Sequence, residues 1–182
     1  TLNLNINPSM QPGIIQIGFG KIPITPEIID TWNDMDGNAK YEPEKGDTYN
    51  DLNSNGEFDA VWIAGFHHLR PAQGIHDDIW ARVMVLDDGQ TRMAIVGLDV
   101  IGLLHDDIVD IRKTLPEHLQ IDYTIICSTH NHEGPDLVGI WGESIFKSGV
   151  DPKYMEFVKK QTVTAIARAV ANMRQAKLKF AQ

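Results

Sequence analysis

The chain has a single cysteine, Cys127, among its 182 residues. One cysteine excludes a framework of intrachain disulfides, so an exported form of the protein needs another source of stability. No apolar run approaches the roughly 18 residues that a membrane-spanning helix needs. Basic side chains are also few, because 16 Lys and Arg stand against 25 Asp and Glu for a formal net charge of −9. This balance argues against a nucleic-acid partner, since nucleic-acid binders present a basic patch.

The rest of the composition is that of a folded protein. Hydrophobic residues make up 42% of the chain and charged residues 23%, which excludes wholesale disorder. A length of 182 residues fits one domain. We therefore expect residues 1–182 to form a single domain with its own core.

Hydrophobic periodicity predicts alternating strands and helices. Predicted strands cover residues 13–19, 79–86, 92–100, 123–128 (buried) and 177–181, and predicted helices cover 106–119, ending near Leu115, and the stretch from 152 onward. Residues 87–90 (DDGQ) form a hairpin turn signal, and Pro116 ends the first helix. Pro152 opens the second helix with Asp151 as its N-cap. This order predicts an α/β fold with a mixed β-sheet and flanking helices.

The negative charge is concentrated in one segment. Residues 33–59 carry eight acidic and two basic side chains, so −6 of the net −9 falls within these 27 residues. Oxygen-bearing side chains recur there at every second position, in one run of Asp34, Asp36 and Asn38 and another of Asp51, Asn53 and Asn55. The second run continues through Gly56, Glu57 and Asp59. This is the spacing of a calcium loop, in which alternate oxygens surround the ion and a glycine makes the turn.

We therefore predict an irregular calcium-binding loop inserted at 33–59. Its predicted Ca²⁺ ligands are Asp34, Asp36, Asn38, Asp47, Asp51, Asn53, Asn55, Glu57 and Asp59. The twelfth loop position is Trp62 rather than the usual Glu, so Asp47 or Glu44 would have to complete the shell. The alternative is a solvated turn, since Asn, Asp and Gly dominate turns. A calcium-held loop suits a secreted, extracellular or periplasmic protein that has no disulfides.

The most informative chemistry lies in residues 129–135 (THNHEGP), directly after the predicted strand at 123–128. Sites in α/β folds lie at the carboxyl ends of strands. Residues two apart on an extended chain point to the same side, so His130 and His132 can face one site. Imidazole suits zinc, although a closed zinc site needs three or four ligands. A hydrogen-bonded histidine pair without metal is the alternative.

A second group of polar residues lies in 74–82 (GIHDDIWAR), which leads into a predicted hairpin strand. His76 is a candidate to face a substrate or orient a metal ligand. Arg82 within a strand requires a carboxylate partner, and Asp99 at the end of the neighbouring strand is the candidate. A histidine hydrogen-bonded within a turn is the alternative for His76.

Four motifs in this order resemble the N-terminal region of the neutral/alkaline (non-lysosomal) ceramidases and their bacterial relatives. They are residues 18–26, similar to the family's G-x-G-K-x-D-I-T-G; 74–82, similar to G-I-H-x-x-x-x-A-R-A; 96–99, similar to an S-x-D strand end; and 129–135, similar to T-H-T-H-S-G-P. Pro23 stands where the family has Asp, and Glu133 where it has Ser.

The resemblance implies a zinc-dependent hydrolase that cleaves the N-acyl amide bond of ceramide, a step of sphingolipid metabolism. It places His132 as a zinc ligand, with His130 beside it as a second candidate ligand and catalytic group. His76 or His130 would orient a ligand or bind the oxyanion. The family's remaining zinc ligands, a His, a Glu and a Tyr, and its catalytic Ser lie downstream of the matched motifs.

The chain would then be the N-terminal part of a larger catalytic domain. Either a C-terminal part or a second chain would complete the sheet at residues 178–181, since an unpaired strand edge seeks a partner. Two functions stay open at this point. One is a hydrolase acting on a lipid or another small amide, and the other is a non-catalytic, calcium-stabilised extracellular structural or interaction module with a ceramidase-like fold.

Overall fold

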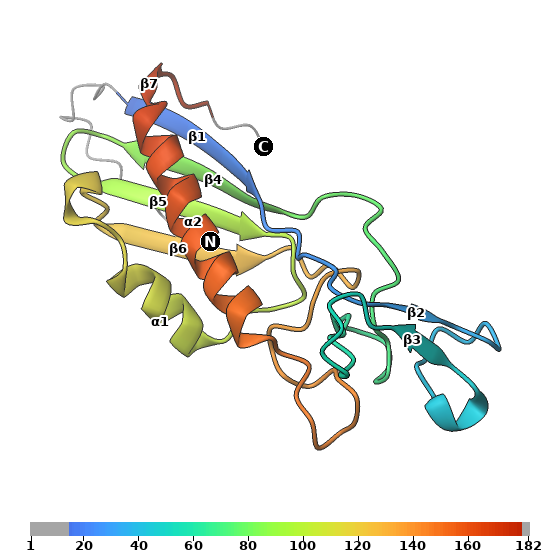
Figure 1. The fold of residues 1–182 in the computed structure, drawn as a ribbon. Helices are drawn as coiled ribbons and strands as arrows, with labels where there is room; N and C mark the ends of the chain where they lie inside the picture. Colours follow the sequence, from blue (N-terminus) through green and yellow to red (C-terminus); the bar gives the residue numbers. More distant parts are fainter. Residues whose placement is uncertain (1–14, 180–182) are drawn as a thin grey trace, which may run out of the picture.

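A computed structural model describes residues 15–179 of the protein. A five-stranded sheet with strand order β6-β5-β4-β1-β7 forms its centre (Figure 1). The strands are β1 (Ile15–Pro23), β4 (Trp80–Asp87), β5 (Arg92–Leu98), β6 (Tyr123–Ser128) and β7 (Arg174–Ala176). The β5–β6 pair is parallel, and the other pairs of this sheet are antiparallel. The prediction of an α/β fold with a mixed sheet and flanking helices is confirmed.

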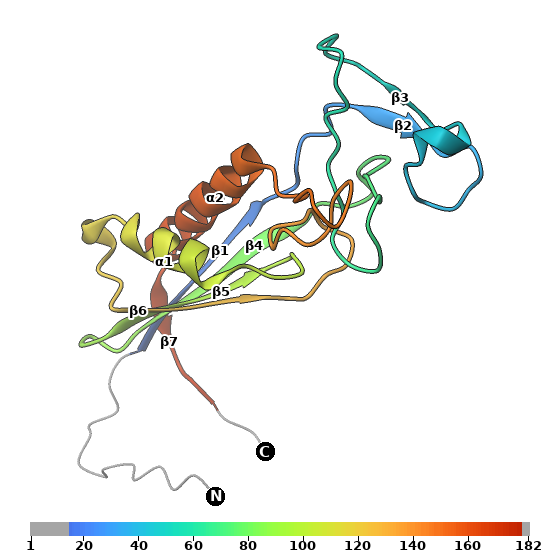
Figure 2. The same ribbon diagram turned by 90° about the horizontal axis from the view of Figure 1, so that it is seen from below.

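Both α-helices of the described chain, α1 (His105–Lys113) and α2 (Pro152–Ala171), lie on the same face of this sheet (Figure 2). Asp151 caps α2 as predicted, because its carboxylate accepts a hydrogen bond from the amide of Lys153. The first helix ends before Pro116, also as predicted. A short 3-10 turn, η2 (Glu117–Leu119), follows and leads into β6.

The core lies between the sheet and α2, and two glycines of β1 let the helix approach closely. A Cβ on Gly18 would lie 1.9 Å from the carbonyl oxygen of Ala169, and one on Gly20 would lie 2.1 Å from that of Ala165. Only a residue without a side chain fits at either position. The helix backbone therefore rests directly on β1 and encloses Val83, Val96, Val158, Ile166 and other buried apolar residues.

The opposite face of the sheet carries apolar side chains in the open. Phe19 and Tyr123 are each 65% exposed, and Ile125 is 50% exposed. Side chains alternate between the two faces of a strand, so β6 buries Ile126 toward the helices and presents its other apolar residues to the uncovered face. The prediction that 123–128 is a buried strand is therefore wrong at alternate positions, and Cys127 is exposed.

The last predicted strand is displaced. The structure has its final strand at Arg174–Ala176, whereas residues 177–179 form no strand. This strand pairs antiparallel with β1, where Ile15 lies opposite Ala176. The predicted strand at 177–181 is thus wrong for its described part, and residues 180–181 lie outside the described range, as do 13–14 of the first predicted strand.

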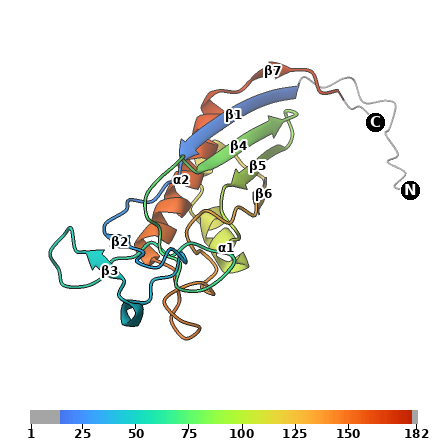
Figure 3. The ribbon, with the colours of Figure 1, turned by 90° about the vertical axis from the view of Figure 1, so that its right-hand side faces the viewer.

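The acidic segment lies between β1 and β4 in the sequence and projects beyond the end of the main sheet (Figures 1 and 3). Together with the residues just before it, the segment forms a second, two-stranded sheet of β2 (Thr31–Asn33) and β3 (Thr48–Asn50), and it contains a 3-10 turn, η1 (Pro43–Lys45). Long connections, including residues 129–150, gather at this same end of the sheet (Figure 1). The end of the sheet beside the acidic segment is therefore where the polar motifs meet.

Candidate active site

The histidine motif follows β6 and continues alongside the end of β5. The amide of Thr129 donates to the carbonyl of Leu98 at 2.9 Å, and that of His130 donates to the carbonyl of Val100 at 3.1 Å. The motif thus lies at the carboxyl ends of two parallel strands, as predicted from the sequence. His130 has a φ of 62°, in the left-handed region that a non-glycine residue seldom adopts. Such strained residues cluster at functional sites.

The two histidines of the motif lie side by side. Their ring centroids are 4.9 Å apart with an interplanar angle of 76°. Nδ1 of His130 lies 2.9 Å from the carbonyl oxygen of Ile101, which only an N–H can satisfy. The proton on Nδ1 leaves Nε2 with the free lone pair, the arrangement found in histidines that bind metal. The structure therefore brings the predicted pair together and fixes the tautomer of His130.

Residues 62–71, which form no recognisable motif, cradle this loop. The amide of Ala64 donates to the carbonyl of Gly134 at 3.0 Å, and the carbonyl of Trp62 accepts from the amide of Asp136 at 2.8 Å. Gly65 approaches the imidazole of His132 so closely that a Cβ there would lie 2.6 Å from Nδ1. The only sequence signal is the glycine itself, and it does not reveal which segment it contacts.

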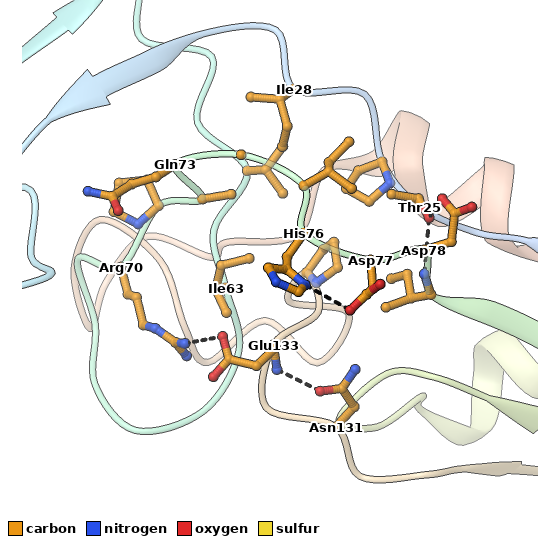
Figure 4. A pocket seen from close by; sticks show the side chains of 18 of the residues that line it. Thr25, Ile28, Ile63, Arg70, Gln73, His76, Asp77, Asp78, Asn131 and Glu133 are labelled. Atoms are coloured by element: carbon orange, nitrogen blue, oxygen red, sulfur yellow. Dashed lines mark hydrogen bonds and ion pairs between the residues drawn. The ribbon is translucent and has the colours of Figure 1, made fainter.

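Arg70 joins the cradle to the motif. Its guanidinium donates to the carbonyl of His132 at 2.9 Å and forms an ion pair with Glu133 (Figure 4). It also lies over the ring of Phe66, with 5.3 Å to the ring centroid. The Phe66 ring in turn meets the edge of His132 at 5.1 Å between centroids. Arg70 therefore holds Glu133 and the backbone of His132 in place.

The acidic segment packs against the same cradle. The indole of Trp32, in β2, donates to the carbonyl of Pro71 at 3.1 Å. The amide of Tyr41 donates to the carbonyl of Leu69 at 2.7 Å. The acidic segment and the strand before it are thus hydrogen-bonded to the part of the chain that contacts His132.

Asp99 and Asp136 are structural carboxylates beside the motif. Asp99 pairs with Arg82, as predicted, and also accepts a hydrogen bond from the amide of Trp80. Asp136 is fully buried and accepts hydrogen bonds from the amides of Val138, Gly139 and Trp141. Its oxygens are occupied by the backbone of the following loop, so it fixes the shape of that loop.

A cavity of about 580 Å³ opens beside the motif (Figure 4). Its lining includes the apolar side chains of Ile28, Ile63 and Ile75, and the polar side chains of Arg70, His76, Asp78, Asn131 and Glu133. The side chains of His130 and His132 do not belong to this lining. The cavity therefore reaches the histidine motif through Asn131 and Glu133.

His76 stands at the rim of this cavity. Its side chain is 98% exposed, and its Nδ1 lies 2.8 Å from a carboxylate oxygen of Asp77. The structure brings His76 to the same cavity as Glu133 but into no contact with the two motif histidines. Its predicted role in orienting a metal ligand therefore has no support from a direct contact.

The predicted calcium ligands gather in two separate loops. Asp34 accepts hydrogen bonds from the amides of Gly37, Asn38 and Ala39, and Asp36 and Asn38 bond each other. Burial by itself raises the pKa of Asp34, but the amide hydrogen bonds outweigh it and hold the pKa below its usual value. In the second loop the amide groups of Asn53 and Asn55 both donate to Asp59 at 2.7 Å, while Glu57 is exposed.

Within residues 15–179, no three His, Cys, Asp or Glu side chains converge as a metal site would require. The histidine pair matches two of the three or four ligands of a zinc site, so it fits half of one. The acidic loops supply Asn as well as Asp oxygens, a donor set that suits a hard cation such as Ca²⁺.

No helix among residues 15–179 is both long enough and apolar enough to cross a bilayer.

No protein-family model matches the chain, and no curated protein matches it. Solved structures of ceramidases do match it. The neutral ceramidase from Pseudomonas aeruginosa superposes with a TM-score of 0.61 at 18% identity, over 91% of this chain and 23% of that chain. A ceramidase complexed with C2 gives 0.60 at 18% identity, over 90% and 22%. The chain thus spans less than a quarter of the ceramidases that it matches, and the expected ceramidase likeness is confirmed for the fold.

Proposed function

We propose that this protein is the N-terminal part of a secreted, zinc-dependent hydrolase that cleaves an N-acyl amide bond. The observation that carries the proposal is the pair of adjacent imidazoles, His130 and His132, at the carboxyl end of β6 in a fold similar to that of a neutral ceramidase.

His130 and His132 are the residues that would hold the zinc. His130 is the better oriented of the two, because the Ile101 carbonyl fixes its tautomer and leaves Nε2 for the metal. His132 is held by Gly65, Phe66 and the Arg70 hydrogen bond to its carbonyl. Zinc, when bound, polarises a scissile carbonyl or lowers the pKa of a bound water. The ligands that complete the site would come from outside residues 15–179.

The cavity beside the motif would receive the substrate. Its isoleucine walls suit the apolar part of an amphipathic amide such as a ceramide, and its polar side chains suit the amide head. Amide hydrolysis adds water across the C–N bond, so a proton must reach the leaving nitrogen. We assign that transfer to Glu133, whose side chain is 68% exposed at the cavity and forms an ion pair with Arg70. The Nδ1 proton of His76 faces the Asp77 carboxylate, so its Nε2 would accept a hydrogen bond at the rim.

The acidic loops support a second candidate function, a non-catalytic, calcium-stabilised extracellular module. Their Asp and Asn oxygens are the proposed Ca²⁺ ligands, and they pack against the cradle through Trp32. The two functions are compatible in one protein, since calcium would order the segment that supports His132. A protein that binds calcium but neither zinc nor substrate would favour the module alone.

The test, made in the longer protein that supplies the remaining ligands, compares His130→Ala, His132→Ala and the control His118→Ala, whose side chain is exposed in η2, before β6. Zinc content is measured by mass spectrometry, and hydrolysis is measured on a ceramide with a fluorescent acyl chain. We expect the control to keep one zinc and full activity. Each motif variant should lose more zinc affinity than the roughly 10- to 100-fold that loss of a ligand's hydrogen-bond partner costs. Unchanged zinc content and activity in both motif variants would show that the assignment is wrong.

A further inference from the structure

Residues 30–42 and 47–59 repeat each other at a spacing of 17 residues. The first stretch, unit 1, reads DTWNDMDGNAKYE, and the second, unit 2, reads DTYNDLNSNGEFD. Identical residues stand at five equivalent pairs of positions: 30 and 47, 31 and 48, 33 and 50, 34 and 51, and 38 and 55. Most of the other pairs are conservative, among them Trp32 with Tyr49 and Met35 with Leu52.

The repeat extends to the strands. Each unit begins with a three-residue strand, β2 in unit 1 and β3 in unit 2, and the two strands pair antiparallel. Trp32 lies opposite Tyr49, its own equivalent, while Thr31 lies opposite Asn50 and Asn33 opposite Thr48. This register means that the units are related by an approximate two-fold axis through the Trp32–Tyr49 pair.

The loops that follow the strands form the same hydrogen bonds at the same offsets. Asp34 accepts from the amides of Asn38 and Ala39, and Asp51 accepts from the amides of Asn55 and Gly56. The side chain of Asn38 donates to Glu42, and that of Asn55 donates to Asp59. Equivalent residues also share the left-handed backbone, with φ of 74° and 60° at Gly37 and Ala39 and of 59° and 82° at Ser54 and Gly56.

The first aspartate of unit 1 holds unit 2. Asp30 is 1% exposed, and its carboxylate accepts hydrogen bonds from the amide of Leu52 at 3.0 Å and from that of Asp59 at 2.8 Å. Both donors belong to the loop of the other unit. A buried carboxylate that accepts two amide hydrogen bonds makes stronger contacts than a neutral group would.

The first aspartate of unit 2 holds unit 1 in the same way. Asp47 is 5% exposed and accepts from the amide of Met35 at 2.9 Å and from that of Glu42 at 2.8 Å. Met35 is the equivalent of Leu52, and Glu42 is the equivalent of Asp59. Each unit's buried carboxylate therefore accepts hydrogen bonds from the loop of the other unit, which is what we mean by exchanged carboxylates. Each loop depends on the other unit for these two hydrogen bonds.

We infer that residues 30–59 are an internal duplication whose two units exchange the carboxylates of Asp30 and Asp47, so that both loops order and open as one unit. Loss of either carboxylate leaves two amides of the opposite loop without their acceptor. The loop that has lost its acceptor no longer holds its own strand in the β2–β3 pair. The strand of the other unit is then unpaired, and the loop that follows it opens as well. The four amides of Met35, Glu42, Leu52 and Asp59 therefore share one opening equilibrium.

The duplication also sets how many ions the segment takes, and this step alone rests on the calcium proposal above. Asp47, like Asp30, is buried and gives both oxygens to amides of the opposite unit, so it supports that unit's loop rather than facing an ion. Two equivalent loops then give two calcium ions per protein. Filling one loop orders the other through the exchanged carboxylates, so the two ions bind with positive cooperativity.

The experiment is hydrogen exchange, measured by NMR, on the protein and on Asp30→Asn, Asp47→Asn and the control Asp88→Asn. Asp88 also accepts amide hydrogen bonds, from Gln90 and Thr91, but lies in the β4–β5 turn. We expect Asp30→Asn and Asp47→Asn each to speed exchange at all four amides by roughly 5- to 150-fold, the range for a lost buried hydrogen bond. Asp88→Asn leaves them unchanged.

Exchange that rises only at Leu52 and Asp59 in Asp30→Asn would overturn the coupling, because the units would then open independently. Exchange that rises equally at Val83 and Val85 of β4 would also overturn it, since that pattern is global unfolding. Calorimetric titration with Ca²⁺ tests the ion count separately. If the protein binds no calcium but the four amides respond together, the calcium proposal fails and the interlocked duplication stands.

Discussion

Replacing Gly65 with alanine tests whether the cradle positions His132. A Cβ at this position would lie 2.6 Å from Nδ1 and 2.8 Å from Cγ of the His132 ring, closer than real Cβ contacts come. The φ of Gly65 is 92°, which L-residues rarely adopt. The imidazole must therefore move, or the cradle must open away from the histidine motif.

The size of the effect can be separated into two parts. Left-handed backbone costs an L-residue about 1–2 kcal/mol, and overpacking of a filled site costs about 1–3 kcal/mol more. Gly89, in the β4–β5 turn, is a matched control because its φ is 84° and a Cβ there has nothing within 4 Å. Gly89→Ala thus pays the backbone part alone. Gly65→Ala should cost about 1–3 kcal/mol beyond it.

Urea unfolding followed by circular dichroism measures both losses, and NMR of the imidazole nitrogens follows His132 directly. We expect changed His132 resonances and weaker zinc binding in Gly65→Ala, with neither change in Gly89→Ala. Equal loss of stability in the two variants, together with unchanged His132 resonances in Gly65→Ala, would refute the reasoning. It would mean that the cradle does not hold the ring.

Three further substitutions test the fold. Gly18→Ala forces α2 away from β1 and should cost about 3 kcal/mol by thermal unfolding, whereas a loss near zero would contradict the close contact. Tyr154→Phe removes the 2.7 Å hydrogen bond to the buried carbonyl of Ile24 and should cost about 1–3 kcal/mol in urea, with full stability as the contrary result. The amide of Gly89 and a neighbouring guanidinium lower the pKa of Asp87, so its contribution is complete above the unfolded pKa of about 4 and is lost as pH falls below it. Asp87→Asn should flatten this acid loss between about pH 4 and 2, and an unchanged slope of stability against pH would disprove it.

Much of the main sheet could be predicted because its signals are local. Asp151 and Pro152 mark the start of α2, and the Asp88-Gly89 turn marks the hairpin, since each signal depends on a few neighbouring residues. The burial of β6 could not be predicted in the same way. Whether Tyr123 and Ile125 are covered depends on which layers pack on each face, and both helices pack on the other one.

In the candidate site, too, local features could be predicted from the sequence and contacts between distant segments could not. The motif that contains His130 and His132 was visible in the sequence, because its residues are adjacent and follow a strand. The cradle at 62–71 was not, because its contact with His132 joins segments more than 60 residues apart. The exchanged carboxylates of Asp30 and Asp47 depend on the pairing of β2 with β3, so the two acidic runs were visible but their interlock was not.

The pairing of β1 with β7 has a consequence for how the chain reaches this structure. Ile15 and Ala176 form a pair although they stand near opposite ends of the described chain. Contacts of such long sequence separation form late and slow folding. At a synthesis rate of roughly 5–20 residues per second, β1 emerges roughly 10–30 seconds before its partner. During that interval the edge of β1 that β7 later occupies, and the face of its glycines that α2 later covers, stay open, and an open strand edge is a template for pairing with another chain.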